Sequence, residues 1–292
     1  MGRKRQLQFG AINITMPAPH RPERYIELFH RAGELDKVVK LKGDWVGKLG
    51  TLRDDKDADG SAIIRGEFYK YIELDSTRDW FNVLKGKPAD ERELDQISIP
   101  EHLKPHFQYV PFVFFSKGHR LVMIIRDKED VISAAQAVTI LRGIFASSEL
   151  VAIFGKIDLV IEPSRDTLEK ILGMPRLRTL EIVVTPPNPD DFEEFERDLF
   201  DDMASQRASS YQLTLQEEEG EGLAPSDKVR KLARVAQSNG KVSGVGGARG
   251  KTTRLSTTEH PLIEKAHYDP DVEIRANVLL VKAREILQQI RN

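Results

Sequence analysis

The stretch KVSGVGGARGKTT, residues 241–253, combines glycines, basic side chains and a Gly-Lys-Thr sequence, the residue types of a phosphate-binding loop. A Walker A motif also needs a glycine five positions before its Gly-Lys pair, and Val245 occupies that position here. A helix that stops at Asn239-Gly240 precedes the stretch, and the β-branched run KTTRLST follows it. We therefore predict a β-hairpin that turns at residues 247–250. Its glycines would let the backbone approach an anion closely.

Positive charge is concentrated around this hairpin, although the net charge of the chain is only −2. Between Lys228 and Arg254 there are eight basic residues and no acidic residue, whereas twelve acidic residues and two arginines lie between Pro189 and Gly222. Such asymmetry is typical of a protein that binds an anionic partner. The alternative is that the two blocks neutralise each other, within one chain or across a dimer.

The segment PSDKVRKLARVAQSNG, residues 225–240, predicts an amphipathic helix directly before the hairpin. Its apolar residues would be buried and its basic residues would lie on the opposite, exposed face. That arrangement suits a phosphate backbone, because arginine can donate two parallel hydrogen bonds to one phosphate. A solvated basic face with no ligand is the alternative. The candidate nucleic-acid-binding residues are Arg230, Lys231, Arg234, Lys241, Arg249, Lys251 and Arg254, with an auxiliary contact from Arg3-Lys4-Arg5.

Two other segments contain residue types that bind metals. EHPLIEKAHYD, residues 259–269, contains Glu259, His260, Glu264 and His267, which could hold a divalent ion of a nuclease, but Pro261 interrupts it. DDKDADG, residues 54–60, opens like a calcium loop but lacks the required closing glutamate, so a hairpin turn is favoured.

No catalytic residue, metal ligand or cofactor is assigned from the sequence. The chain has no Gly-x-Ser-x-Gly motif and no serine with a plausible local base. A binding protein is therefore favoured over an enzyme.

The elements that must position these residues indicate an α+β fold with two domains. Each domain is expected to be a mostly antiparallel or mixed sheet with helices packed on one face, and a C-terminal helix follows. We place a β-rich domain at 1–130, a connecting helix at 131–150, an α/β sandwich-like domain ending in the basic hairpin at 151–258, and a C-terminal extension with a helix at 259–292. The second domain should open with a strand over residues 151–163.

The composition indicates the kind of cellular compartment in which the protein is expected. The 292 residues are 40% apolar, contain no cysteine, and include no run long and apolar enough to span a membrane. We expect a soluble, cytoplasmic protein without disulfides.

Four segments together resemble an uncharacterised family of bacterial and phage proteins, a domain of unknown function of about this length. They are WFN at 80–82, IPEHLKPHF at 99–107, RLRTLEIVVTPPNPDD at 176–191 and LSTTEHPLIEKAHYDP at 255–270. The order of elements also resembles, more distantly, that of the phage lambda exclusion protein RexA and its relatives. That second resemblance implies a prophage-associated homodimer that binds DNA without strong sequence preference and acts in phage exclusion or antiviral defence.

Three functions follow from these observations. The first is a non-enzymatic protein that binds nucleic acid, DNA rather than RNA, as a homodimer. The second is a metal-dependent nuclease or hydrolase of a defence or toxin system that uses Glu259, His260, Glu264 and His267. The third is a protein–protein interaction subunit in which the acidic segment 190–202 docks on a basic partner.

Overall fold

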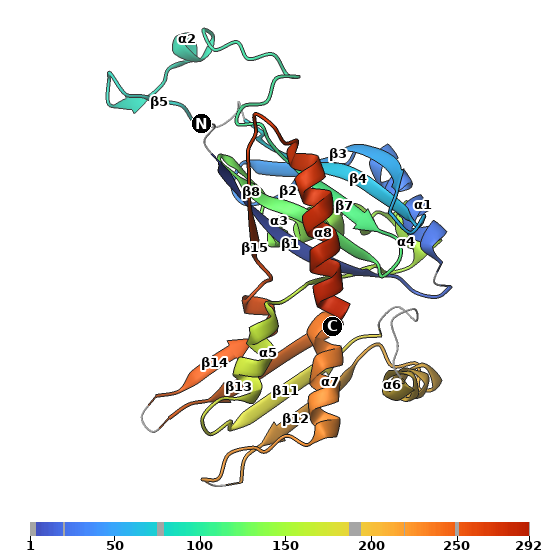
Figure 1. The fold of residues 1–292 in the computed structure, drawn as a ribbon. Helices are drawn as coiled ribbons and strands as arrows, with labels where there is room; N and C mark the ends of the chain where they lie inside the picture. Colours follow the sequence, from blue (N-terminus) through green and yellow to red (C-terminus); the bar gives the residue numbers. More distant parts are fainter. Residues whose placement is uncertain are drawn as a thin grey trace.

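The computed structural model describes residues 4–19, 21–74, 79–186, 194–218, 220–248 and 251–291. Two antiparallel sheets, one large and one of four strands, dominate this part of the chain (Figure 1). The predicted α+β class is therefore confirmed. The large sheet has the order β10-β1-β8-β7-β4-β3-β2, with β15 paired to β1 and β9 paired to β8. Its strands are β1 Arg5–Thr15, β2 Val39–Lys40, β3 Trp45–Lys56, β4 Ala62–Ile72, β7 Gln108–Phe115, β8 Arg120–Asp127, β9 Asp130–Val131, β10 Asp158–Ile161 and β15 Glu264–Tyr268.

Strand β1 connects distant parts of the chain. One edge of it pairs with β8, and the other edge pairs with β10 through residues 12–15 and with β15 through residues 5–9. Its side chains are buried on both faces of the sheet: Leu7 and Phe9 belong to one apolar core, and Ile12 and Ile14 belong to another. Strand β1 is therefore covered on both faces of the sheet.

Helices cover the two faces of the large sheet. On one face lie α1 Pro22–Glu34, α3 Ala134–Phe145 and α4 Ser148–Phe154, and their apolar side chains share a core with the sheet. On the other face lies α8 Arg275–Arg291 (Figure 1). Both the helical segment at 131–150 and the C-terminal segment at 259–292 thus pack against the first sheet.

The start of α8 is fixed by one arginine. Arg275 Nη1 donates hydrogen bonds to Asp127 at 3.0 Å and to Asp130 at 3.2 Å. Its guanidinium carbon also lies 4.1 Å from the centre of the Tyr109 ring. These contacts hold the C-terminal helix against β7, β8 and β9, although it follows them by a long stretch of sequence.

The strand predicted over residues 151–163 is wrong in its first part. Residues 151–154 belong to α4, because Leu150 and Phe154, four positions apart, are buried on one side of a helix. Gly155, with φ of +75°, ends the helix, and β10 begins only at Asp158. Within the described ranges, no single helix is long and apolar enough to cross a bilayer, and α3 with α4 reach that measure only as a pair bent by 84°.

The smaller sheet has the order β12-β11-β13-β14, and α5 and α7 cover one of its faces. The predicted β13–β14 hairpin is confirmed, and a helix precedes it as the sequence predicts. The elements of this region are α5 Arg165–Leu172, β11 Thr179–Val184, α6 Glu194–Ser205, β12 Tyr211–Gln216, α7 Asp227–Ser238, β13 Gly240–Gly246, β14 Thr253–Ser256 and a 3₁₀ turn at Thr257–Glu259.

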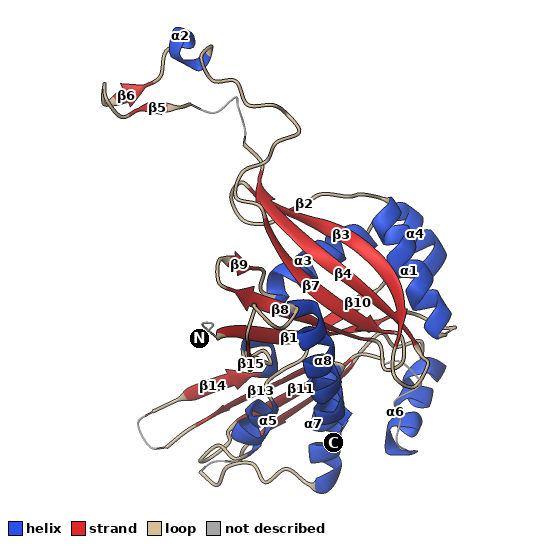
Figure 2. Cartoon of the chain, turned by 45° about the horizontal axis from the view of Figure 1, so that its top comes forward, coloured by secondary structure: helices blue, strands red, loops and turns tan. Residues whose placement is uncertain are grey.

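A third, small group of elements projects away from both sheets (Figure 2). It leaves the large sheet after β4 and returns at β7. It contains the two-stranded ribbon of β5 Phe81–Asn82 and β6 Lys87–Pro88, followed by the short helix α2 Glu91–Leu94.

A buried polar network joins the two sheets. Arg120 and Glu162 are 7% and 2% exposed, and Arg120 Nε donates to Glu162 Oε1 at 2.6 Å. Arg120 Nη1 donates to Asn13 Oδ1 at 2.7 Å, and Ser238 Oγ donates to Glu162 Oε2 at 2.9 Å. Asn13 Nδ2 donates to the Ser238 carbonyl at 2.8 Å and to Asn239 Oδ1 at 2.9 Å. The network therefore ties β1, β8 and the end of β10 to the C-terminal end of α7.

Replacing Glu162 with alanine should lower the free energy of unfolding by about 3 kcal/mol, because the Arg120 guanidinium would stay buried without its carboxylate. Urea unfolding followed by circular dichroism measures the change. Asp166→Ala is the matched control: it removes a carboxylate from the exposed Asp166–Lys170 pair and should leave the urea midpoint nearly unchanged. Equal midpoints for the two variants would show that the buried pair does not stabilise the fold.

Candidate nucleic-acid interface

Helix α7 is the element that carries most of the predicted binding residues. Its start is capped by the Ser226 hydroxyl, which accepts a hydrogen bond from the Val229 amide, and Asp227 lies in the first turn. Leu232, Ala233, Val235 and Ala236 are buried against the small sheet. The 3.6-residue period then directs the basic side chains away from the sheet, as the sequence predicts.

The basic residues of α7 differ in their freedom to bind a ligand. Lys228, Lys231 and Arg234 are exposed. Arg230 is half-buried, and its Nε donates to the Pro225 carbonyl at 3.2 Å, so part of its guanidinium is already used.

The ion pairs around the small sheet do not include the exposed cations of α7. The pairs join Lys170 to Asp166, Arg176 and Arg178 to Glu217, and Lys241 to Glu181. Among the described residues, none of these pairs involves Lys228, Lys231 or Arg234. Within the part of the chain that the structure describes, these three cations therefore form no direct ion pair with a carboxylate.

The hairpin residues lie on the other side of the small sheet. Val242 and Gly244 face the helices, since Val242 belongs to the core and a Cβ at Gly244 would meet Ile171 of α5. Because side chains alternate along a strand, Lys241 faces the opposite, open side. Arg254 pairs with Val245 across the hairpin and shares that open side.

The open face also carries a carboxylate at its centre. Glu181 Oε2 lies 3.9 Å from Lys241 Nζ and accepts a hydrogen bond from Ser243 Oγ at 3.1 Å. Gln212 Nε2 donates to Glu181 Oε1 at 3.2 Å. Lys241 is thus partly neutralised, whereas Lys251 and Arg254 are exposed.

The structure therefore divides the predicted surface into two groups. Arg230, Lys231 and Arg234 lie on the helix layer, and Lys241 and Arg254 lie on the open sheet face. Arg249 lies outside the described residues, as does Arg3 of the N-terminal segment, whereas Lys4 is exposed and Arg5 begins β1. The two-residue period of strand β13 could have predicted this division from the sequence. It places the side chain of Val242 in the core and that of Lys241 on the opposite face.

The sequence does not predict that one further basic residue lies near α7. Arg165, at the start of α5, is exposed and lines the same pocket as Arg234. The pocket has a volume of about 580 Å³ and lies between α5, the end of α7, the end of α8 and the Gly118–Arg120 turn. Arg165 and Arg234 come together only because α5 and α7 pack side by side on the sheet, which no local pattern reveals.

The residues of the metal-site hypothesis are not brought together. Glu264 and His267 lie on opposite faces of β15, where Glu264 pairs with Lys282 at 3.2 Å and a His267 ring nitrogen lies 3.4 Å from Gln6 Nε2. No group of three His, Cys, Asp or Glu side chains among the described residues, which include all of 259–269, is arranged to hold a metal ion.

The acidic turn at 57–61 is a hairpin turn, as the sequence predicts. The Ser61 hydroxyl and amide donate to Asp59 Oδ1 at 2.6 and 3.0 Å, and Lys117 pairs with the same carboxyl group. The hydrogen bonds from Ser61, followed by that from Lys117, hold the pKa of Asp59 well below its usual range. That carboxylate serves the turn itself.

The fold and the surface define an α+β protein of two antiparallel sheets, the smaller of which carries a helix with an exposed basic face. The chain belongs to the family described as a domain of unknown function, DUF4747, which matches residues 5–284. The match covers nearly the whole chain and confirms that the protein is a member of an uncharacterised family. The comparison with curated proteins finds no match.

Replacing Asn13 with leucine should loosen the C-terminal end of α7, because the Ser238 carbonyl and the Asn239 side chain would lose their partner on β1. We expect amide hydrogen exchange over residues 235–240 to accelerate about tenfold, the effect of losing buried hydrogen bonds. Mass-spectrometric exchange measures it, and Asn277→Leu, at an exposed position of α8, is the control. Unchanged protection of α7 in the Asn13 variant would show that the network does not anchor the helix.

Proposed function

We propose that the protein binds double-stranded DNA through the exposed face of α7, without strong sequence preference and without catalysing a reaction. We call this face, made of Lys228, Lys231, Arg234 and the neighbouring Arg165, the α7 basic face. The observation that carries the proposal is that three exposed cations follow one another along a helix and form no ion pair with another described residue.

The spacing of these cations suits a phosphate backbone. Lys228, Lys231 and Arg234 are separated by three residues each, or about 4.5 Å along the helix axis. Duplex DNA carries one negative charge per about 1.7 Å of its own axis, so several phosphates lie within reach of such a row. Binding would release condensed counterions and would therefore weaken steeply with added salt.

The absence of aromatic residues favours duplex DNA over RNA loops or single strands. The sequence has no Phe, Trp or Tyr between Gln212 and His267, a stretch that covers α7 and both strands of the hairpin. Proteins that bind single strands stack bases on aromatic side chains. This surface can offer charge and hydrogen bonds but no such stacking, which suits contact with a continuous phosphate backbone.

Arg254 of the open sheet face and Lys251 of the turn before β14 would make a second, weaker contact. They lie on the other side of the small sheet from α7, so one straight duplex cannot contact both groups on the same molecule. We propose further that the protein acts in the cytoplasm as a homodimer, in phage exclusion or another antiviral defence. This last role is supported by the order of elements, which resembles that of RexA and its relatives.

Replacing Lys228, Lys231 and Arg234 together with alanine should reduce the slope of log Kd against log salt by about 2 to 3, roughly one unit for each cation that contacts a phosphate. Fluorescence anisotropy with a labelled DNA duplex at several salt concentrations measures the slope.

The matched control removes three exposed cations elsewhere, Lys40, Lys42 and Lys265, and changes the net charge equally. Its slope should stay within half a unit of the unmodified protein. A second variant, Lys251→Ala with Arg254→Ala, reports on the open sheet face. If only this second variant flattens the slope, the hairpin and not α7 is the binding surface. Cleavage of plasmid DNA in the presence of Mg²⁺ or Mn²⁺ would contradict the proposal that the protein catalyses no reaction. It would favour the nuclease alternative instead.

A further inference from the structure

The projecting arm, residues 79–107, carries three exposed apolar side chains at its tip, and one of them, Leu84, is the most exposed large apolar side chain of the described residues. Phe81, Val83 and Leu84 are 65%, 79% and 95% exposed. A contiguous group of exposed apolar side chains on an ordered segment is typical of a protein–protein interaction site.

The tip is held in place by local hydrogen bonds. Asn82 Oδ1 accepts hydrogen bonds from the Leu84 and Lys85 amides, each at 2.9 Å, and Lys85 Nζ lies 2.6 Å from Glu93 Oε1 of α2. Asp90 and Glu93 also form a capping box at the start of α2. The apolar side chains at the tip are therefore presented by a folded turn and cannot simply retract.

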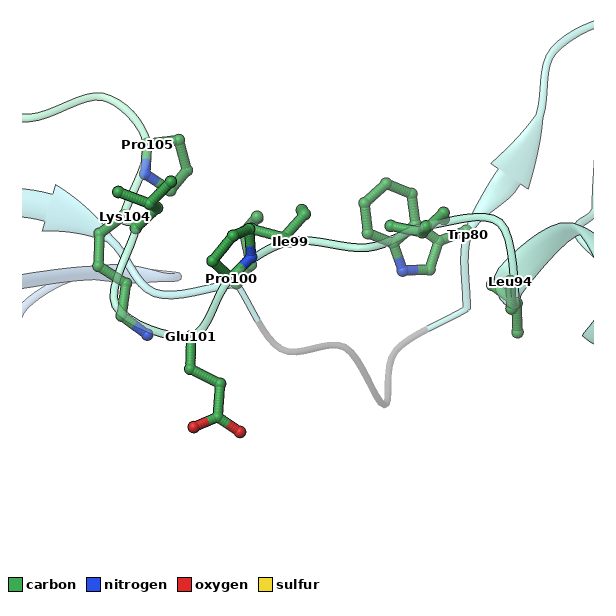
Figure 3. A pocket seen from close by; sticks show the side chains of 10 residues that line it. Trp80, Leu94, Ile99, Pro100, Glu101, Lys104 and Pro105 are labelled. Atoms are coloured by element: carbon green, nitrogen blue, oxygen red, sulfur yellow. The ribbon is translucent and has the colours of Figure 1, made fainter.

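The same arm contains an apolar pocket of about 410 Å³ nearer to the large sheet. Figure 3 shows Trp80 and Leu94 at one end, Lys104 and Pro105 at the other, and Ile99 between them. The pocket is held to the body, since the Ile72 amide donates to the Pro105 carbonyl at 3.0 Å. With Leu84 almost fully exposed, the tip does not fill the pocket of its own chain.

Charges around the tip and the pocket are complementary. Lys87 follows the tip, is exposed, and forms no ion pair with another described residue. Glu91 lies on the helix that forms the pocket wall, and Glu101 lies on its rim with its carboxylate directed outward (Figure 3). Both are exposed and take part in none of the ion pairs described for the arm.

We propose that two copies of this chain dimerise by a reciprocal clasp of their projecting arms, in which Val83 and Leu84 of each arm enter the pocket of the other. One arm carries both the apolar tip and the apolar pocket, and a surface that complements itself closes as a two-fold dimer. Each copy then covers the other's apolar side chains, and Lys87 of one arm approaches Glu91 and Glu101 of the other. The inference extends the homodimer part of the proposed function and does not require DNA binding.

The first test uses two variants, Leu84→Asp in the tip and Ile99→Asp in the pocket. Each should weaken self-association of the full chain at least about tenfold, because a charge would replace an apolar side chain at the contact. An equimolar mixture of the two variants should recover much of the association, since one of its two tip–pocket contacts is intact. Sedimentation velocity over a range of concentrations measures all three samples, and circular dichroism verifies that each variant is folded.

The second test uses the absence of cysteine in the natural chain. A chain with Leu84→Cys mixed with a chain with Ile99→Cys should form an intermolecular disulfide on mild oxidation. The control mixture pairs Leu84→Cys with Val281→Cys, another exposed apolar position, and should not form one.

A monomeric natural chain at high concentration would overturn the proposal, as would a Leu84→Asp variant that associates normally or a mixture that recovers nothing. If the chain is monomeric but still binds DNA with a steep salt dependence, the clasp is wrong and the proposal for the α7 basic face is unaffected. A stable dimer that does not bind DNA would support the clasp and reject DNA binding by the α7 basic face.

Discussion

The buried ion pair between Arg120 and Glu162 lies at the centre of the polar network that joins the large sheet to helix α7 of the smaller one. Removing two charges from water is costly, and the cost is offset only when further hydrogen bonds satisfy both groups. Here Asn13, Ser238 and the Gly118 carbonyl supply those bonds. Asn13 and the Gly118 carbonyl belong to the large sheet and its turn, whereas Ser238 ends α7, so the complete set of hydrogen bonds forms only when α7 lies against the large sheet.

That constraint decides which surface α7 offers to solvent. With its C-terminal end fixed to β1 and its apolar side buried on the small sheet, the helix directs Lys231 and Arg234 outward. The alternation of β13 places Lys241 on the other side of the same sheet. A continuous block of positive charge in the sequence is thus separated into two surfaces, and on the open sheet face Lys241 is paired with Glu181 whereas the three α7 cations form no ion pair with another described residue.

Local patterns in the sequence account for much of the fold. The hairpin at 241–256, the helices at 165–172 and 227–238 and the strands around the Asp-Gly turn at 57–61 all follow from periodicity and turn chemistry. Other features depend on contacts between distant residues. The burial of β1 on both faces requires α8, the helix at 151–154 reflects packing of Phe154, and Arg165 joins Arg234 only in the folded protein. The apolar tip of the projecting arm is visible in the sequence, but its exposure is not.

The central claim, that α7 and not the open sheet face makes the main contact with DNA, can be tested by site-specific cross-linking in this cysteine-free chain. A photo-activated cross-linker would be attached to a cysteine at Asp227, beside the α7 basic face, or at Thr214, on the open sheet face next to Glu181. Neither substitution removes a cation. The account predicts that a DNA duplex is cross-linked from position 227 and hardly at all from 214. Efficient cross-linking from 214 with none from 227 would contradict it.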